Sequence, residues 1–306
     1  MVRRLIRLFI LSLAAGPAWA QVQPAQNIQA PQPAPTVFSR MRGLLDIELP
    51  QLDPPGTVTL ILHPHFSDLV RRDYMRIDGG FRWALNDHFE LSSEAAGFFT
   101  HGLRHGDEGY GIGDLRLGTK YIFQEWLRPD FEASVAYNVE LPIGRPPVDL
   151  TDGHNHYVPS FAIQHHSARN PHLTTFAGAG LDFIGPSTVP GTFSFNEPHD
   201  DSFSLTAGGV YDVGQMKWTL SGTYATTAII GGTTKNFFYL SPSVLWYVPK
   251  KIMFNAKTQW ILVLGTPMTW GPDGFQFKTT TRVRAEITFR QVMNNLRQRT
   301  SGNKPP

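Results

Sequence analysis

Apolar and polar positions alternate along most of the chain between Thr57 and Phe289. The clearest segment is Tyr74–Leu85, whose odd positions are apolar or glycine and whose even positions include Arg76, Asp78 and Arg82. A period of two is typical of a β-strand, whereas a helix repeats every 3.6 residues. The charged face cannot pack into a dry core. One apolar face and one charged face, repeated over many strands, predict a transmembrane β-barrel with a polar interior.

The same alternation predicts about twelve strands, of about the length that a tilted membrane-spanning strand needs. The predicted strands are Thr57–Phe66, Tyr74–Leu85, His88–Phe99, Ile112–Phe123, Phe131–Leu141, Tyr157–His165, Leu173–Ile184, Ser202–Tyr211, Met216–Ala225, Phe237–Val248, Ile252–Leu264 and Phe275–Phe289. An even number suits a bacterial barrel. The expected fold is therefore all-β, a single up-and-down antiparallel transmembrane β-barrel.

The predicted connections alternate between short turns, such as Asn86-Asp87, and longer loops, such as Thr100–Gly111 and Gly265–Gly274. Short turns on the periplasmic side and long outer loops are typical of bacterial barrels. Aromatic residues gather at the strand ends beside the short turns, where they predict an interfacial girdle: Trp83, Phe89, Tyr121, Phe123, Trp126, Phe131, Trp218, Trp246 and Phe254.

A secreted soluble protein, either a sandwich or a lipocalin-like barrel, is the main alternative, because it shows similar alternation with the apolar face inside. Two features favour the membrane barrel. The polar face holds many small neutral residues, including Gly80, Ala84 and Ser92, and the apolar face continues through every strand without dividing into two sheets. A hydrophobic content of 41% suits either class.

The N-terminus predicts export. Arg3, Arg4 and Arg7 precede a short apolar run, and Ala18-Trp19-Ala20 has the small-x-small pattern of a cleavage site. We therefore expect a signal peptide at 1–20, a Pro/Gln-rich periplasmic leader at 21–55, the barrel at 56–289 and a basic polar tail at 290–306. The cell outer membrane is the expected destination. The chain has no cysteine, which excludes lipid attachment at a cysteine and disulfides.

Three segments resemble a known bacterial family. Trp83–Leu91 (WALNDHFEL) is similar to a strand–turn–strand segment of the outer-membrane barrels named for the meta-pathway of phenol degradation. Gly111–Tyr121 resembles that family's GxGDxxLGxKY strand, and Val139–Gly144 matches its strand-ending LPxG. The resemblance extends over roughly residues 54–289. One departure concerns the last strand, where the basic tail follows Phe289, the terminal aromatic that assembly machinery would read.

The resemblance implies an outer-membrane transporter and a passive channel for small compounds, and the family name adds hydrophobic or aromatic solutes. The expected partners are outer-membrane lipid, a small-molecule solute and the barrel-assembly machinery. A structural or partner-binding barrel without transport is the alternative. The formal net charge of +2 provides no argument for nucleic acid. We expect no cofactor, and the oligomeric state stays open.

Charged residues on the polar parity of adjacent strands are the candidate lumen-lining residues for transport: Arg76, Asp78, Arg82, Glu90, Glu94, Asp114, Arg116, Lys120, Glu132 and Glu140. Residues opposite one another on neighbouring strands can form charge ladders. Two interpretations follow. The charges either close a narrow barrel or set selectivity, as rings of charge do in pores.

Two other chemistries remain as weaker alternatives. His63/His65 and His154/His156 have a spacing that places both imidazoles on one face of a strand, but no carboxylate or thiolate completes a recognisable ligand set, so no metal site is expected. His165-x-Ser167 with Asn170 is similar to a motif of outer-membrane lipid hydrolases. Its spacing departs from that motif and no acidic residue orients the histidine, so we expect no enzyme.

Overall fold

The computed structural model describes residues 53–65, 74–100, 110–143, 154–185, 201–227, 235–252, 259–272, 274–277 and 280–288. Fourteen strands form one antiparallel sheet: β1 Thr57–Pro64, β2 Tyr74–Ala84, β3 Phe89–Thr100, β4 Tyr110–Phe123, β5 Phe131–Pro142, β6 His156–His166, β7 Leu173–Ile184, β8 Ser202–Asp212, β9 Met216–Thr226, β10 Asn236–Tyr247, β11 Gln259–Gly265, β12 Met268–Gly271, β13 Gly274–Phe277 and β14 Thr280–Thr288. Within these ranges, no helix has the length and apolar character required to span a membrane.

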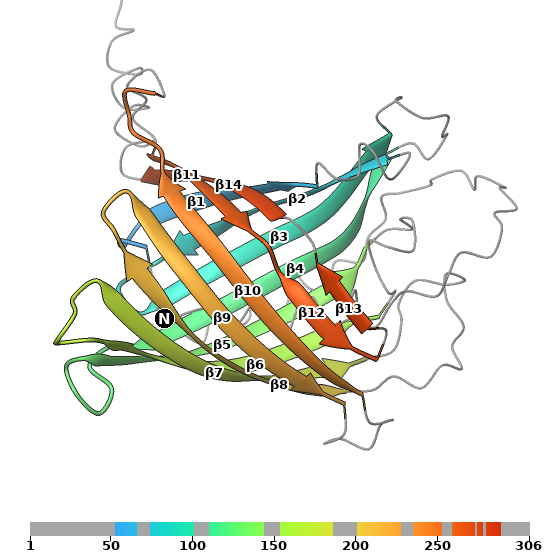
Figure 1. Cartoon of the computed structure of the whole chain (residues 1–306). Coiled ribbons are helices and arrows are strands. Elements are labelled where there is room, and N and C mark those ends of the chain that lie inside the picture. Colours follow the sequence, from blue (N-terminus) through green and yellow to red (C-terminus); the bar gives the residue numbers. More distant parts are fainter. Residues whose placement is uncertain are drawn as a thin grey trace, which may run out of the picture. The chain divides into compact units, whose positions relative to one another are not determined.

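The sheet closes on itself (Figure 1). Neighbouring strands pair in chain order from β1 to β10, β10 pairs with β11, β11 with β14, and β14 with β1. β11 and β12 both pair with β10, so they are two parts of one crossing, and β13 and β14 are likewise the two parts of the next. The fourteen elements therefore make twelve crossings of an up-and-down barrel, which confirms the predicted fold.

Two predicted boundaries near the C-terminus are wrong. Gly265–Gly274 was expected to be a long loop, but β12 and β13 continue the hairpin through it to a tight turn, where Gly274 adopts a φ of 86°. Prolines at 267 and 272 flank β12, which still pairs with both β10 and β13. Ile252 was expected to begin a strand, but it lies in a turn, where its N–H donates to the Pro249 carbonyl at 2.9 Å.

Local turn chemistry sets the short connections at one end of the barrel. The Asn86 side-chain oxygen accepts the backbone N–H groups of His88 and Phe89, both at 2.9 Å, so this Asx turn leads β2 into β3. Between β8 and β9, the Asp212 carboxylate accepts the N–H of Gly214, which has a φ of 73°. A side chain would strain the backbone at that angle. The long connections are at the opposite end.

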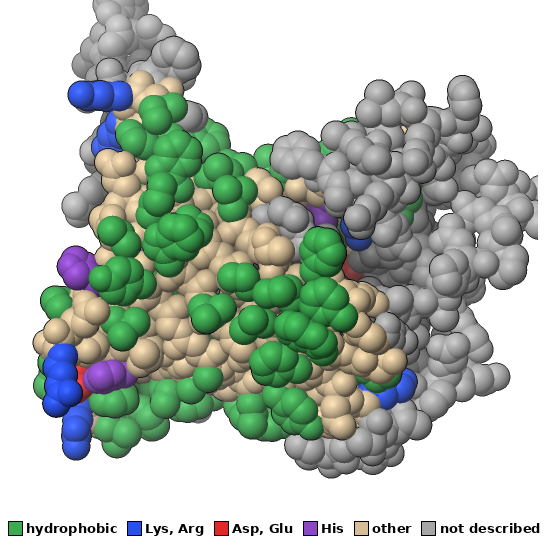
Figure 2. All heavy atoms as spheres, in the orientation of Figure 1, with side chains coloured by type: hydrophobic (Ala, Val, Ile, Leu, Met, Phe, Trp, Pro, Cys, Tyr) green, Lys and Arg blue, Asp and Glu red, His purple; other side chains and the backbone are tan. Residues whose placement is uncertain are grey.

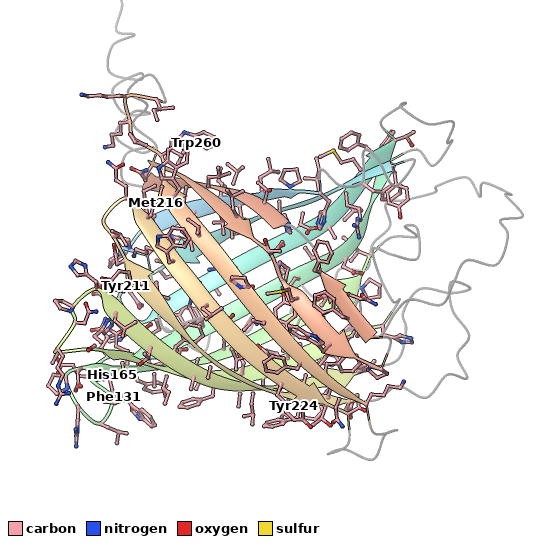
Figure 3. All side chains as sticks on the ribbon, viewed as in Figure 1. Phe131, His165, Tyr211, Met216, Tyr224 and Trp260 are labelled. Carbon is pink, nitrogen blue, oxygen red and sulfur yellow. The ribbon has the colours of Figure 1, made fainter. Side chains whose placement is uncertain are left out.

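The outward face of the sheet is apolar and divides into bands. Leu60, Leu62, Val135, Leu205 and Leu220 are exposed toward the middle of their strands. Exposed aromatic residues lie toward both ends; Figure 3 labels Tyr211 near the short turns and Tyr224 near the opposite end. Figure 2 shows hydrophobic side chains covering the face over β9, β10 and β12, with Lys, Arg and His near its edge. This apolar surface between two aromatic girdles suits lipid contact.

A β-bulge reshapes the strand that carries the GxGD sequence. The register of β3 and β4 shifts so that both Gly113 and Asp114 lie opposite Ala96. Gly111 and Gly113 lie within β4, close to where it follows the long connection from β3. A Cβ on Gly111 would lie 2.8 Å from the Phe98 ring, so this glycine makes room for the aromatic ring on the neighbouring strand. The bulge leaves Asp114 buried.

Candidate functional site

The ten charged residues singled out in the sequence lie on four adjacent strands, β2 to β5, on the face opposite the exposed leucines and aromatics. Arg76, Asp78, Glu90, Asp114 and Lys120 are buried, with exposed fractions of 9% or less. The other five are half-buried: Arg82, Glu94, Arg116, Glu132 and Glu140. Charges shielded on one face of a closed sheet therefore form the polar interior of the barrel.

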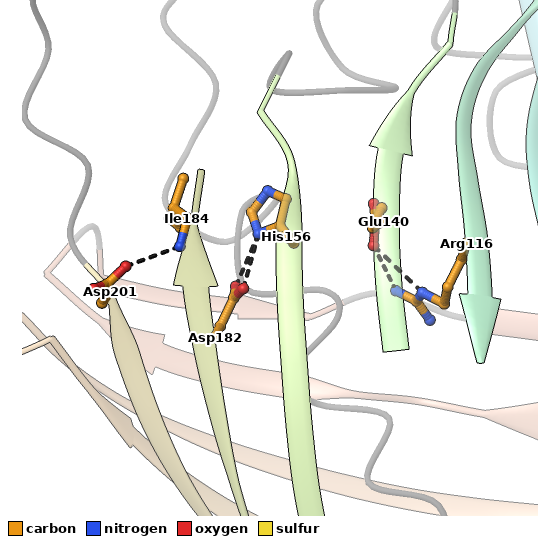
Figure 4. A network of polar contacts seen from close by, with 6 residues as sticks. All are labelled: Arg116, Glu140, His156, Asp182, Ile184 and Asp201. Carbon is orange, nitrogen blue, oxygen red and sulfur yellow. Dashed lines mark hydrogen bonds and ion pairs between the residues drawn. The ribbon is translucent and has the colours of Figure 1, made fainter. Parts of the chain in front are cut away.

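A row of alternating charge crosses this interior near the long connections. Arg116 on β4 lies directly opposite Glu94 of β3 and Glu140 of β5, and Glu140 lies opposite His156 of β6. Arg116 Nη2 is 3.0 Å from Glu140 Oε2. The row ends where His156 Nδ1 lies 3.0 Å from the Asp182 carboxylate of β7 (Figure 4). Cross-strand pairs of opposite sign stabilise neighbouring strands, so the row acts as a ladder across the sheet.

A second ion pair lies nearer the short turns. Lys120 Nζ is 3.1 Å from Glu90 Oε1, and each side chain is only 3% exposed. Glu132, also toward this end, accepts a hydrogen bond from the Gln164 amide of β6. Gly118 lies between Arg116 of the charged row and Lys120 of this ion pair. A Cβ at this position would lie 2.3 Å from both Asn138 Oδ1 and Ser92 Oγ, so only glycine fits here. Polar groups therefore pack closely on this side of the barrel.

The opposite side of the interior is lined by hydroxyl groups. Ser202, Ser204 and Thr206 on β8 are buried, as are Thr223 on β9 and Thr269 on β12. Thr206 and Thr223 form a hydrogen bond of 2.7 Å between their hydroxyl groups. Among the side chains that the structure describes, charges concentrate on β2–β7, and neutral hydrogen-bonding groups concentrate on β8, β9 and β12.

The histidines have partners that sequence spacing alone did not reveal. His63 and His65 lie on one buried face as expected, but Asp78 of β2 lies directly opposite His63 and completes a group of three. The expectation that no carboxylate joins these histidines was wrong, because cross-strand register is not visible in the spacing. His154 and His156 are also buried. His101, His105 and His199 lie outside the described residues.

The segment considered for lipid hydrolysis has other contacts in the structure. His165 Nε2 lies 3.0 Å from Asp130 Oδ2, and the imidazole packs on the Phe131 ring with 4.6 Å between centroids. Ser167 Oγ accepts the backbone N–H of Asn170 at 3.2 Å. These contacts stabilise the turn between β6 and β7. The expectation that no acidic residue accompanies this histidine was wrong, because Asp130 is distant in sequence and meets His165 only through the pairing of β5 with β6. Ser167 has a role in turn structure.

Several solved structures are similar to this barrel. The COG4313 outer membrane channel from Pseudomonas putida F1 superposes with a TM-score of 0.51 at 12% identity, over 77% of this chain and 96% of that one. The KdgM porin gives 0.43 at 12% identity, over 76% and 99%, and the CymD monoaromatic hydrocarbon channel gives 0.41 at 9% identity, over 78% and 89%. No curated protein sequence matches the chain.

The family comparison covers most of the chain. The model of the family described as "Putative MetA-pathway of phenol degradation" matches residues 67–279, which is more than half of the sequence. The match includes the GxGDxxLGxKY strand and most of the inward-facing charges. With its closed sheet, apolar outer surface and the fold of an outer-membrane channel, the chain is an outer-membrane β-barrel that belongs to this family.

Proposed function

We propose that the protein is a passive channel for small solutes across the outer membrane. The observation that carries this proposal is the closed ring of strands, whose outer face is apolar and whose inner face carries a row of charges opposite a hydroxyl-lined wall. A polar interior enclosed by a lipid-facing surface provides a route that bilayer lipid does not. Insertion by the barrel-assembly machinery is part of the same proposal.

The arrangement of charges suggests how the channel would select solutes. Arg116 has an acidic residue on each neighbouring strand, so its own charge is paired, but three carboxylates against one arginine leave the row net negative when His156 is neutral. A narrow lumen with this residual negative charge would favour cations modestly and would discriminate more strongly by size and hydrogen bonding. The hydroxyl groups on the facing wall offer hydrogen bonds to a neutral polar group. The family description concerns phenol degradation, so small aromatic compounds are the first solutes to test.

Planar-bilayer recording of the purified barrel tests the proposal. Wild-type protein should give discrete conductance steps, and a salt gradient should give a measurable reversal potential. Arg116→Gln should shift that potential toward cation preference, because Glu94 and Glu140 then lack the cation between them. Glu140→Gln should shift it toward anions.

The matched control for these variants is Arg128→Gln, which removes an exposed arginine from the turn between β4 and β5. It should leave the reversal potential unchanged. A folded wild-type barrel that gives no conductance and no solute flux into vesicles would overturn the channel proposal and favour a structural or partner-binding role.

A further inference from the structure

We propose that His63, His65 and Asp78 form a binding site for a divalent first-row transition-metal ion on the inner face of the barrel. The register of two neighbouring strands brings the three together. His63 of β1 lies directly opposite Asp78 of β2, and His65 follows two residues later on the same face. The His65 N–H donates to the Arg76 carbonyl at 2.9 Å, so this register continues past the end of β1. The three side chains are 4%, 1% and 7% exposed.

The separations between ligand atoms are close to those of a metal site. His63 Nδ1 lies 3.3 Å from Asp78 Oδ2, and His65 Nε2 lies 2.9 Å from the same oxygen. All three candidate ligand atoms lie within 4.8 Å of one another. Ligands bonded to a tetrahedral Zn²⁺ at about 2.0–2.1 Å are about 3.3 Å apart. Small rotations of the side chains would therefore bring the three atoms into a common coordination sphere.

The ligand types indicate which ions fit. Imidazole nitrogens with a carboxylate oxygen suit Zn²⁺, Co²⁺, Ni²⁺, Cu²⁺ or Fe²⁺, whereas Mg²⁺ and Ca²⁺ prefer oxygen ligands alone. Two neutral imidazoles and one carboxylate carry a single negative charge, which a divalent cation would more than offset. Three protein ligands also leave a coordination position for water or for a solute inside the barrel.

One neighbouring group opposes cation binding. Arg76 is buried on the same face of β2, two residues from Asp78. Its positive charge should weaken the affinity for a cation, so Arg76→Gln should bind the metal more tightly than the wild type. A higher metal affinity in this variant is informative, because a nonspecific loss of structure would lower the affinity instead.

The position of the group in the barrel suggests access from the interior. His63 is the penultimate residue of β1, at the end of the barrel that bears the long connections. The charged row from Glu94 to Asp182 lies at the same end. A metal ion held by His63, His65 and Asp78 would add positive charge to this part of the inner wall. Its binding can be measured whether or not the barrel conducts solutes.

Metal titration of the untagged, full-length barrel in detergent tests the proposal. Isothermal titration with Zn²⁺ should give one site per chain. Co²⁺ should give the visible absorption of a site with imidazole ligands and fewer than six ligands in total. His63→Gln, His65→Gln and Asp78→Asn should each weaken Zn²⁺ binding by at least about 100-fold, since losing a residue that merely supports a ligand already costs about 10–100-fold.

His172→Gln provides the matched control, because it removes an exposed histidine from the turn between β6 and β7. It should leave the affinity unchanged, and heat-modifiable gel migration should confirm that every variant is folded. If a ligand variant does not fold, X-ray absorption of the Zn²⁺-loaded wild type decides the matter through the presence of two imidazoles. The proposal is overturned by a wild type that binds no Zn²⁺, by equal affinity in the double variant His63→Gln/His65→Gln, or by an equal loss in His172→Gln.

Discussion

The buried ion pair between Lys120 and Glu90 is the sharpest test of how the barrel interior is stabilised. We predict that Lys120→Met strongly destabilises the fold. The Nζ–Oε1 distance is 3.1 Å and both side chains are 3% exposed, so little solvent screens the pair. At that distance and an effective dielectric constant of about 20, the attraction between two unit charges is about 5 kcal/mol. Removing the lysine leaves the carboxylate buried without this partner.

Breaking a buried pair in this way costs about 3–5 kcal/mol, whereas replacing both partners with apolar residues of similar size is often neutral or stabilising. We therefore expect Lys120→Met and Glu90→Met each to lower the free energy of unfolding by about 3–5 kcal/mol. The double variant should recover most of the loss, and the coupling energy should exceed about 2 kcal/mol. The two residues are directly opposite in the register of β3 and β4, so the substitutions act on one contact.

Urea unfolding of the barrel in lipid vesicles, followed by tryptophan fluorescence, measures these free energies. The Lys217–Asp212 pair provides the control, because its atoms are 3.4 Å apart but the side chains are 22% and 40% exposed. Lys217→Met should cost less than about 1 kcal/mol, as exposed pairs do. Additive losses in the double variant, or a cost for Lys120→Met no larger than that for Lys217→Met, would refute the reasoning.

Two further substitutions test the close approach of strands and the lipid-facing surface. Gly80→Ala should destabilise the barrel by about 1–3 kcal/mol, because its Cβ would lie 2.3 Å from the Ser93 carbonyl oxygen, while Gly79→Ala, with nothing nearer than 4.0 Å, should change stability by less than about 0.5 kcal/mol in the same urea assay. Leu220→Arg should cost about 2–4 kcal/mol in bilayers, since Leu220 is 53% exposed on the outer face, and Leu127→Arg in a short turn should cost at most about 1 kcal/mol. Equal costs within either pair would contradict the assigned environments.

The C-terminal hairpin shows both what the alternation predicts and what it leaves open. The alternation correctly indicated that this part of the chain crosses the membrane, but it did not show where the strands end. Met268–Gly271 pairs with both β10 and β13, although two prolines flank it. Pairing with existing neighbours therefore outweighed the local loop signals. Strand ends depend on partners that are distant in sequence, so composition near the end of a strand predicts them poorly.

In the barrel interior, the sequence likewise predicts which face a side chain lies on but not which side chains it contacts. The period of two assigned Arg116, Glu140 and Asp78 to the polar face, and all three are shielded there. It did not show that Arg116 binds Glu140 or that Asp78 meets two histidines. A contact across strands depends on register, and a shift of one residue would place different side chains opposite one another. The bulge at Gly113 and Asp114 is such a local change.

The sequence by itself determined the class of the fold, because alternation with a period of two places every second side chain on the same face of a strand. It also determined that one face meets lipid and that the other carries charge. The tertiary structure decided which groups meet across the interior, including the row from Glu94 to Asp182 and the group of His63, His65 and Asp78. Those contacts require the strand register and the closure of β14 onto β1, which no local pattern encodes.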